Sequence, residues 1–108
     1  MISVVWRENI AQIGVTDALD ISASPALVST VARVAKEAKS IILDLTDCGY
    51  IDSLSLSAVL KLVESQTLDY IVVPAKGNIR KILTLAGVTS RLPLVVSVEE
   101  ALENLSQP

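Results

Sequence analysis

One stretch of the chain, from Ile41 to Val63, constrains the fold more than any other. Residues 41–45 are almost continuously apolar and branched, which is typical of a strand buried on both faces. A turn is expected at residues 47–49, and apolar side chains then recur at helical spacing through residues 56–63. We therefore expect a central strand that leads, through one short loop, into an amphipathic helix.

Asp52 and Ser53 stand directly before this helical pattern. A short polar residue at that position caps a helix, because its oxygen accepts hydrogen bonds from N–H groups that lack a partner within the first turn. The same N–H groups and the helix dipole favour an anion, so a phosphate on Ser53 would lie in a receptive place. Leu54 does not fit the apolar face of the helix, and we expect it to be exposed beside Ser53.

The rest of the chain alternates strands and helices after an initial hairpin. This alternation predicts the α/β class, with a mixed, mainly parallel sheet, an N-terminal β-hairpin and about four helices in a single domain spanning residues 1–108. The loop expected after the hairpin covers residues 16–22. The other expected segments are strands at Ile2–Trp6, Ile10–Val15, Tyr70–Val73 and Leu94–Val96, and three further helices. The first of these helices is expected to have Ser24 as its cap and Pro25 as its first residue, the second to be capped by Asn78 and ended by Gly87, and the last to begin with a capping box formed by Ser97 and Glu100.

The composition excludes several classes of function. The chain has 108 residues, of which 51% are hydrophobic and 19% charged, and its net charge of −3 predicts no general attraction for nucleic acid. Because there is no histidine and only one cysteine, Cys48, a Ser-His-Asp triad, a Cys-based zinc site and an internal disulfide are impossible. The sequence shows neither a signal peptide nor a membrane-spanning segment. We expect a cytoplasmic protein without metal, cofactor or membrane insertion.

Four interpretations of Asp52 and Ser53 are open from the residues alone. The pair could serve only as a helix cap. Ser53 could be a nucleophile, for which the only candidate base is a lysine such as Lys61. Asp47 or Asp52 could accept a phosphoryl group, although no acidic pair follows the first strand to hold the metal that this reaction needs. Ser53 could instead carry a phosphate as a switch.

Basic residues are expected close to this position. If the strands at Ile41 and Ile71 are neighbours, the loops that follow them lie side by side at the edge of the sheet where ligands usually bind. Lys76, Arg80 and Lys81 would then lie near Ser53, where they could meet a phosphate or acidic groups of a partner. A solvated helix face is the alternative interpretation.

Several segments together resemble the STAS family, the domain of bacterial anti-sigma factor antagonists. The most specific is the strand and turn ILDLTDCGYIDS, which matches the strand and the Asp-Ser phosphorylation motif of that family. The segments LDISASPALV, NIRKILTLAGV and SVEEAL extend the resemblance over nearly the whole chain. The resemblance implies a mixed sheet packed by helices, as the residue patterns also predict.

The resemblance further implies a binding protein with no catalytic residue. An unphosphorylated domain of this family binds an anti-sigma factor that is also a serine kinase, phosphorylation ends the association, and a phosphatase restores it. By position, Ser53 matches the phosphorylated serine. A constitutive scaffold in a signalling assembly or beside a transporter is an alternative, and a serine-dependent enzyme is an alternative from another class.

The chain departs from the family pattern directly after Ser53. Where the family commonly has Asp-Ser-Ser-Gly-Leu-Gly, this chain has Leu54 for the second serine and Ser55 and Ser57 for the glycines. We expect these changes to alter the docking surface and Leu54 to supply an apolar contact. The predicted partner-binding residues are Asp52, Ser53, Leu54, Ser55, Ser57, Lys61, Lys76, Asn78, Arg80 and Lys81.

Overall fold

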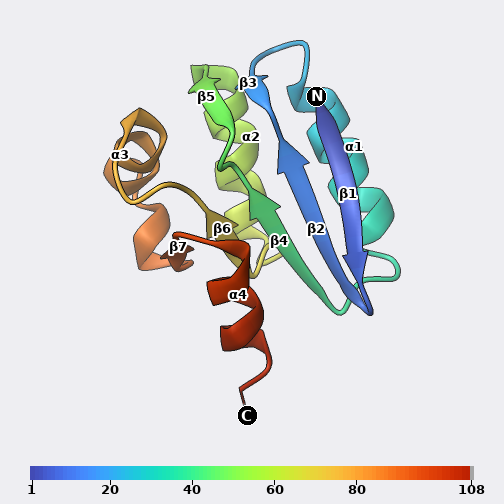
Figure 1. Cartoon of the computed structure of the whole chain (residues 1–108). Helices are drawn as coiled ribbons and strands as arrows, with labels where there is room; N and C mark the ends of the chain where they lie inside the picture. Colours follow the sequence, from blue (N-terminus) through green and yellow to red (C-terminus); the bar gives the residue numbers. More distant parts are fainter. Residues whose placement is uncertain (108) are drawn as a thin grey trace.

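A five-stranded sheet runs through the molecule, whose computed structural model describes residues 1–107 (Figure 1). The first two strands form an antiparallel hairpin, and all other neighbours in the sheet are parallel. Both features confirm the expectation of a mixed, mainly parallel sheet. In spatial order the strands are β1 (Ile2–Arg7), β2 (Ile10–Val15), β4 (Ser40–Asp44), β6 (Tyr70–Val72) and β7 (Leu94–Val95).

Four α-helices contribute to the two hydrophobic cores of residues 1–107. Helices α1 (Ser24–Val34), α2 (Ser53–Glu64) and α3 (Asn78–Leu85) contribute to one core, and α4 (Val98–Leu105) packs on the opposite face. A short 3-10 helix, η1 (Val88–Ser90), follows α3. The four helices agree with the number expected from the sequence.

Strand β4 is the central strand, as its continuous apolar run predicts. Ile41 and Leu43 belong to the core under α1 and α2, whereas Ile42 belongs to the core under α4. Because successive side chains of a strand point to opposite faces, both faces of β4 are buried and each needs an apolar residue. This strand therefore joins the two layers of helices.

A second, two-stranded sheet was not predicted. Strands β3 (Asp17–Leu19) and β5 (Cys48–Ile51) pair in parallel, with Leu19 opposite Ile51. The expectation that residues 16–22 form only a loop, and that the chain merely turns at residues 47–49, is therefore wrong. Each strand is too short for a clear period-two pattern, and each exists because the other supplies its hydrogen-bond partners.

The expected ends of the later helices are largely confirmed. Ser97 caps α4 by accepting a hydrogen bond from the Glu100 N–H at 3.1 Å, and Gly87 has the left-handed conformation after α3, with φ of 87°. The expectation that Ser24 caps α1 is wrong, because Ala23 is at the cap position without a side-chain hydrogen bond and Ser24 is the first helical residue. The expectation that Asn78 caps α3 is also wrong. Gly77 occupies the cap position with φ of 127°, a conformation open mainly to glycine, and Asn78 is the first helical residue.

Candidate partner-binding site

Strand β5, which pairs with β3, ends directly before the start of α2. Directly after the paired residues, the Asp52 N–H donates a hydrogen bond to the Leu19 carbonyl at 3.2 Å. This bond places the loop that follows β3 beside the N-terminus of α2, although the two are about 30 residues apart in sequence. In Figure 1, β3, β5 and the first turn of α2 lie at the same end of the molecule.

Asp52 is the N-cap of α2, as predicted. Its Oδ1 accepts a hydrogen bond from the Ser55 N–H at 2.8 Å. This N–H is the main cause that lowers the pKa of Asp52 below its ordinary value, and the nearby Ser55 hydroxyl acts in the same direction. The Ile21 N–H also favours the charged carboxylate, while the negative charge of Asp20 opposes it. Asp52 is therefore a carboxylate at neutral pH.

Asp20 adds a second negative charge beside the cap. Its carboxylate accepts hydrogen bonds from the Ser22 hydroxyl at 2.7 Å and from the N–H groups of Ser22 and Ala23, both at 3.1 Å. The Ser22 hydroxyl is the largest cause of the lowered pKa of Asp20, followed by the Ala23 N–H. The start of α2 is thus flanked by two carboxylates that keep their charge.

Ser53 is the first residue of α2 and its side chain is exposed. Among the side-chain hydrogen bonds of residues 1–107, none involves the Ser53 hydroxyl. Ser57 and Lys61 follow at intervals of four residues and are also exposed, as the helical periodicity predicts. These three side chains form one solvent-facing row along α2 that begins at the candidate phosphorylation site.

Three large apolar side chains border this region. Leu54 is 63% exposed, which confirms its predicted position outside the core. Ile21 is 65% exposed and Tyr50 is 57% exposed. Neither Ile21 nor Tyr50 was predicted from the sequence; the Ile21 N–H lies near the Asp52 carboxylate, and Tyr50 is in β5, two residues before Asp52. A group of exposed apolar side chains of this kind suits a docking surface.

The predicted basic residues gather mainly around α3. Strands β4 and β6 are neighbours, as expected, and α3 packs against β5. Arg80, however, donates hydrogen bonds to the carbonyls of Pro74 at 2.7 Å and Val73 at 3.2 Å, and so holds the loop between β6 and α3. Lys76 and Lys81 line a shallow groove of about 460 Å³ on this helix. Their approach to Ser53 stays a prediction.

Comparison with known proteins identifies the family. The STAS domain family matches residues 1–101. The chain belongs to the STAS domain family. No curated protein sequence matches the chain.

Solved structures of low sequence identity share the fold of this STAS domain. An anti-sigma factor antagonist from Mycobacterium paratuberculosis is 20% identical, with 99% of this chain and 94% of that chain covered and a TM-score of 0.86. Unphosphorylated SpoIIAA, also an anti-sigma factor antagonist, is 13% identical over 100% of both chains, with a TM-score of 0.73. The phosphorylated form of SpoIIAA, a Bacillus cell fate determinant, is 15% identical, with 97% and 99% covered and a TM-score of 0.69.

Ser55 is not part of the exposed surface of this STAS domain, contrary to the sequence analysis. It is 0% exposed and lies on the same side of α2 as the buried Val59 and Val63, at four-residue spacing. Its hydroxyl is near the Asp52 carboxylate but makes no hydrogen bond of acceptable geometry. Ser55 can therefore affect docking only through the packing of the first helical turn.

Three further observations concern metal binding, membrane spanning and the position of Lys61. Within residues 1–107, no group of three His, Cys, Asp or Glu side chains is arranged to hold a metal ion. None of the helices in the described chain is long and apolar enough to cross a membrane. Lys61 lies two helical turns from Ser53, about 12 Å along the axis, which is poor geometry for a general base.

The buried Ser55 hydroxyl leads to a stability prediction. Ser55→Ala should raise the free energy of unfolding by about 1 kcal/mol, because it removes a polar group that is desolvated without a hydrogen bond. Urea denaturation measures the change. Ser57→Ala is the matched control, since it gains the same helix propensity at an exposed position. If Ser55→Ala is no more stable than Ser57→Ala, the hydroxyl is satisfied in solution.

The lowered pKa of Asp52 leads to a pH prediction. The stability that it contributes is complete above the pKa of the unfolded state and is lost as the pH falls through the lower folded-state pKa. Asp52→Asn keeps a cap oxygen but no charge, so its stability deficit should be constant above about pH 5 and shrink as the pH falls below the unfolded-state pKa of about 4. Asp52→Ala removes both cap and charge and should keep a deficit at the lower pH. A constant deficit for Asp52→Asn, measured by urea denaturation, contradicts this assignment.

Proposed function

We propose that this STAS domain is an anti-sigma factor antagonist-like module that binds an anti-sigma factor with serine kinase activity. Phosphorylation of Ser53 by that kinase ends the association, and a phosphatase restores it. The domain needs no catalytic activity of its own for this role. The observation that supports the proposal best is the exposed Ser53 side chain, with a free hydroxyl, at the first position of a capped helix.

The charges around Ser53 explain how a phosphate could act as a switch. A phosphoserine adds about −1.5 to −2 charges at neutral pH. Asp52 already occupies the Ser55 N–H, and Asp20 adds further negative charge, so the phosphate competes with a carboxylate for the helix N-terminus. A partner surface fitted to a hydroxyl would have to desolvate this phosphate beside like charges. The cost of several kcal/mol corresponds to a loss of affinity of orders of magnitude.

The exposed apolar side chains suggest how the unphosphorylated form gains affinity. Leu54 is adjacent to Ser53 in sequence, the Ile21 N–H lies near the Asp52 carboxylate, and Tyr50 precedes Asp52 by two residues. Burial of such side chains in an interface contributes roughly 1.5–3 kcal/mol each. The apolar contacts and the serine switch would therefore act on one surface. A single phosphate on Ser53 would then disfavour burial of the neighbouring apolar side chains against the partner.

The role of Ser53 distinguishes the proposed switch from the two alternatives, a constitutive scaffold and a serine-dependent enzyme. A constitutive scaffold, in a signalling assembly or beside a transporter, would bind its partner irrespective of the state of Ser53. An enzyme that uses Ser53 as nucleophile would need a base within hydrogen-bond reach, and the position of Lys61 on the second turn after Ser53 disfavours it. The proposal therefore depends on whether a negative charge at Ser53 changes binding.

The central test compares Ser53→Asp and Ser53→Ala. Binding to the kinase-type anti-sigma factors of the source organism, measured by calorimetry, should weaken at least tenfold for Ser53→Asp, because a negative charge enters the interface. Ser53→Ala should bind within about threefold of the unmodified protein, since it adds no charge. Kinase and ATP should phosphorylate the protein on Ser53, as read by mass spectrometry.

Ser57 provides the control for this test, because it is an exposed serine one turn further along the same row. Ser57→Ala should be phosphorylated normally, whereas Ser53→Ala should not be phosphorylated. Equal binding by Ser53→Asp and the unmodified protein would support the scaffold and reject the switch. Phosphate on a residue other than Ser53 would reject the assigned site.

Leu54 provides a second prediction. Leu54→Ser should weaken binding of the same anti-sigma factor about tenfold to a hundredfold, through loss of apolar burial in the interface. The free energy of unfolding should change by less than about 0.5 kcal/mol, because the side chain is 63% exposed. Leu85→Ser is the control, since Leu85 is 82% exposed on α3. Equal losses of affinity for the two variants would show that Leu54 has no special contact.

A further inference from the structure

The outer edge of β1 has a regular set of free backbone groups. Met1 and Thr16 exchange two hydrogen bonds, from the Met1 amine at 3.2 Å and from the Thr16 N–H at 3.0 Å. In an antiparallel pair, hydrogen-bonded residues alternate with residues whose N–H and C=O point away from the neighbour. The register of β1 with β2 therefore directs the N–H and C=O groups of Ile2, Val4 and Trp6 away from the sheet.

This edge lacks the protection found at the opposite edge of the same sheet. Strand β7 has two residues and follows Pro93, and the next N–H, that of Val96, donates to Glu100 Oε2 at 3.0 Å. Strand β1 has six residues, ISVVWR, with no proline and no lysine. Short length, proline and covered N–H groups are the usual means of preventing edge-to-edge pairing. Their absence marks β1 as the edge that is open to another strand.

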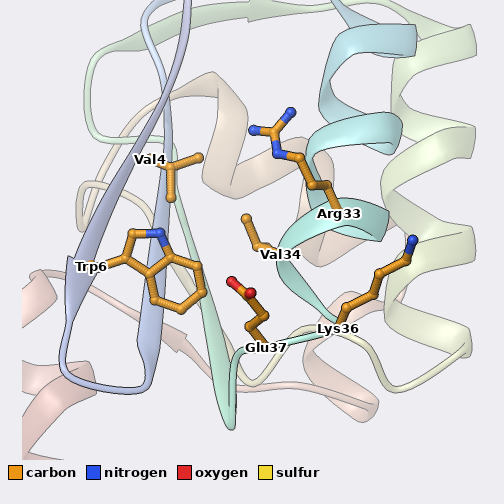
Figure 2. Close-up of a pocket in the computed structure, with 6 residues that line it drawn as sticks. All are labelled: Val4, Trp6, Arg33, Val34, Lys36 and Glu37. Atoms are coloured by element: carbon orange, nitrogen blue, oxygen red, sulfur yellow. The ribbon is translucent and has the colours of Figure 1, made fainter.

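The side chains along this edge are mainly apolar and partly exposed. Val4 and Trp6 line a groove of about 380 Å³ between β1 and α1, opposite Val34 (Figure 2). Trp6 is 43% exposed, and Figure 2 shows its ring facing the groove with the Glu37 carboxylate beside it. Large apolar side chains next to unpaired strand groups favour a strand as the occupant of this edge, because a strand satisfies both.

We propose that β1 pairs antiparallel with β1 of a second copy of this chain, with Val4 on the two-fold axis. In this register Val4 exchanges two hydrogen bonds with Val4 of the second copy. Ile2 pairs with Trp6 of the second copy, and Trp6 pairs with its Ile2. Every outward N–H and C=O group of Ile2, Val4 and Trp6 then has a partner, and the two sheets become continuous.

A second copy fits this edge because the pattern of free groups is symmetric about Val4. A two-fold axis maps Ile2 onto the position of Trp6 and leaves Val4 in place, so β1 is complementary to itself. The cross-strand pairs are apolar on the α1 face, with Trp6 against Ile2, and Ser3 meets Val5 on the other face. None of the pairs between residues 2 and 6 brings like charges together.

This pairing is independent of the proposed switch. Asp52 and Ser53 follow β5, which belongs to the two-stranded sheet and not to the edge formed by β1. A pair of chains joined through β1 would carry two Ser53 sites, and the pairing would leave both of them exposed. Failure of the Ser53 experiments would leave the pairing intact, and the reverse also holds.

The experiment uses Val4→Pro, because proline removes only an outward N–H group. The bonds between β1 and β2 do not use that N–H, so the hairpin should persist, as checked by circular dichroism. Sedimentation equilibrium of the unmodified chain should show a monomer–dimer equilibrium. Its single tryptophan, Trp6, should shift its emission to shorter wavelength as the dimer forms. Val4→Pro should raise the dissociation constant of the dimer at least tenfold.

Two further variants keep the result decisive if Val4→Pro does not fold. Val4→Lys places two like charges on the two-fold axis and should also raise the dissociation constant at least tenfold. Val28→Lys adds the same charge at a 42% exposed valine of α1 and should leave the dissociation constant unchanged. A monomer at every concentration up to about 1 mM, or a folded Val4 variant that dimerises as tightly as Val28→Lys, overturns the proposal.

Discussion

The pairing of β3 with β5 is the interaction on which the candidate site depends. It ends in the hydrogen bond from the Asp52 N–H to the Leu19 carbonyl, and it brings together segments that are distant in sequence. Without this pair, α2 would still have an Asp-Ser start, but Asp20 and Ile21 would have no fixed relation to it. The site therefore depends on both strands: Asp52 and Ser53 follow β5, whereas Asp20 and Ile21 follow β3.

The electrostatic character of the site follows from this arrangement. Asp52 uses the free N–H of the first helical turn, and Asp20 uses the hydroxyl and N–H groups that precede α1. Both carboxylates are held in their charged form, while Arg80 donates to backbone carbonyls of its own loop. A phosphate on Ser53 would thus join negative charges, and the sign of its effect on docking follows from charges that are already present.

The two proposed association surfaces are separate. One surrounds Ser53 and combines a hydroxyl, two carboxylates and exposed apolar side chains. The other is the edge of β1, where backbone groups and Trp6 are open to a second strand. They differ in chemistry, since a single charge would control the first, whereas the second would depend on a row of hydrogen bonds that only a matching strand can satisfy.

The sequence by itself determined the hairpin, the doubly buried β4, the helix that begins after Asp52 and the exposure of Leu54, because each depends on a pattern within one segment. Only the tertiary structure decided that Ser55 is buried, that Ile21 and Tyr50 border the site, and that two short strands lie where loops were expected. The physical reason is that a strand of three or four residues becomes stable only through hydrogen bonds to a partner remote in sequence, which no local pattern contains.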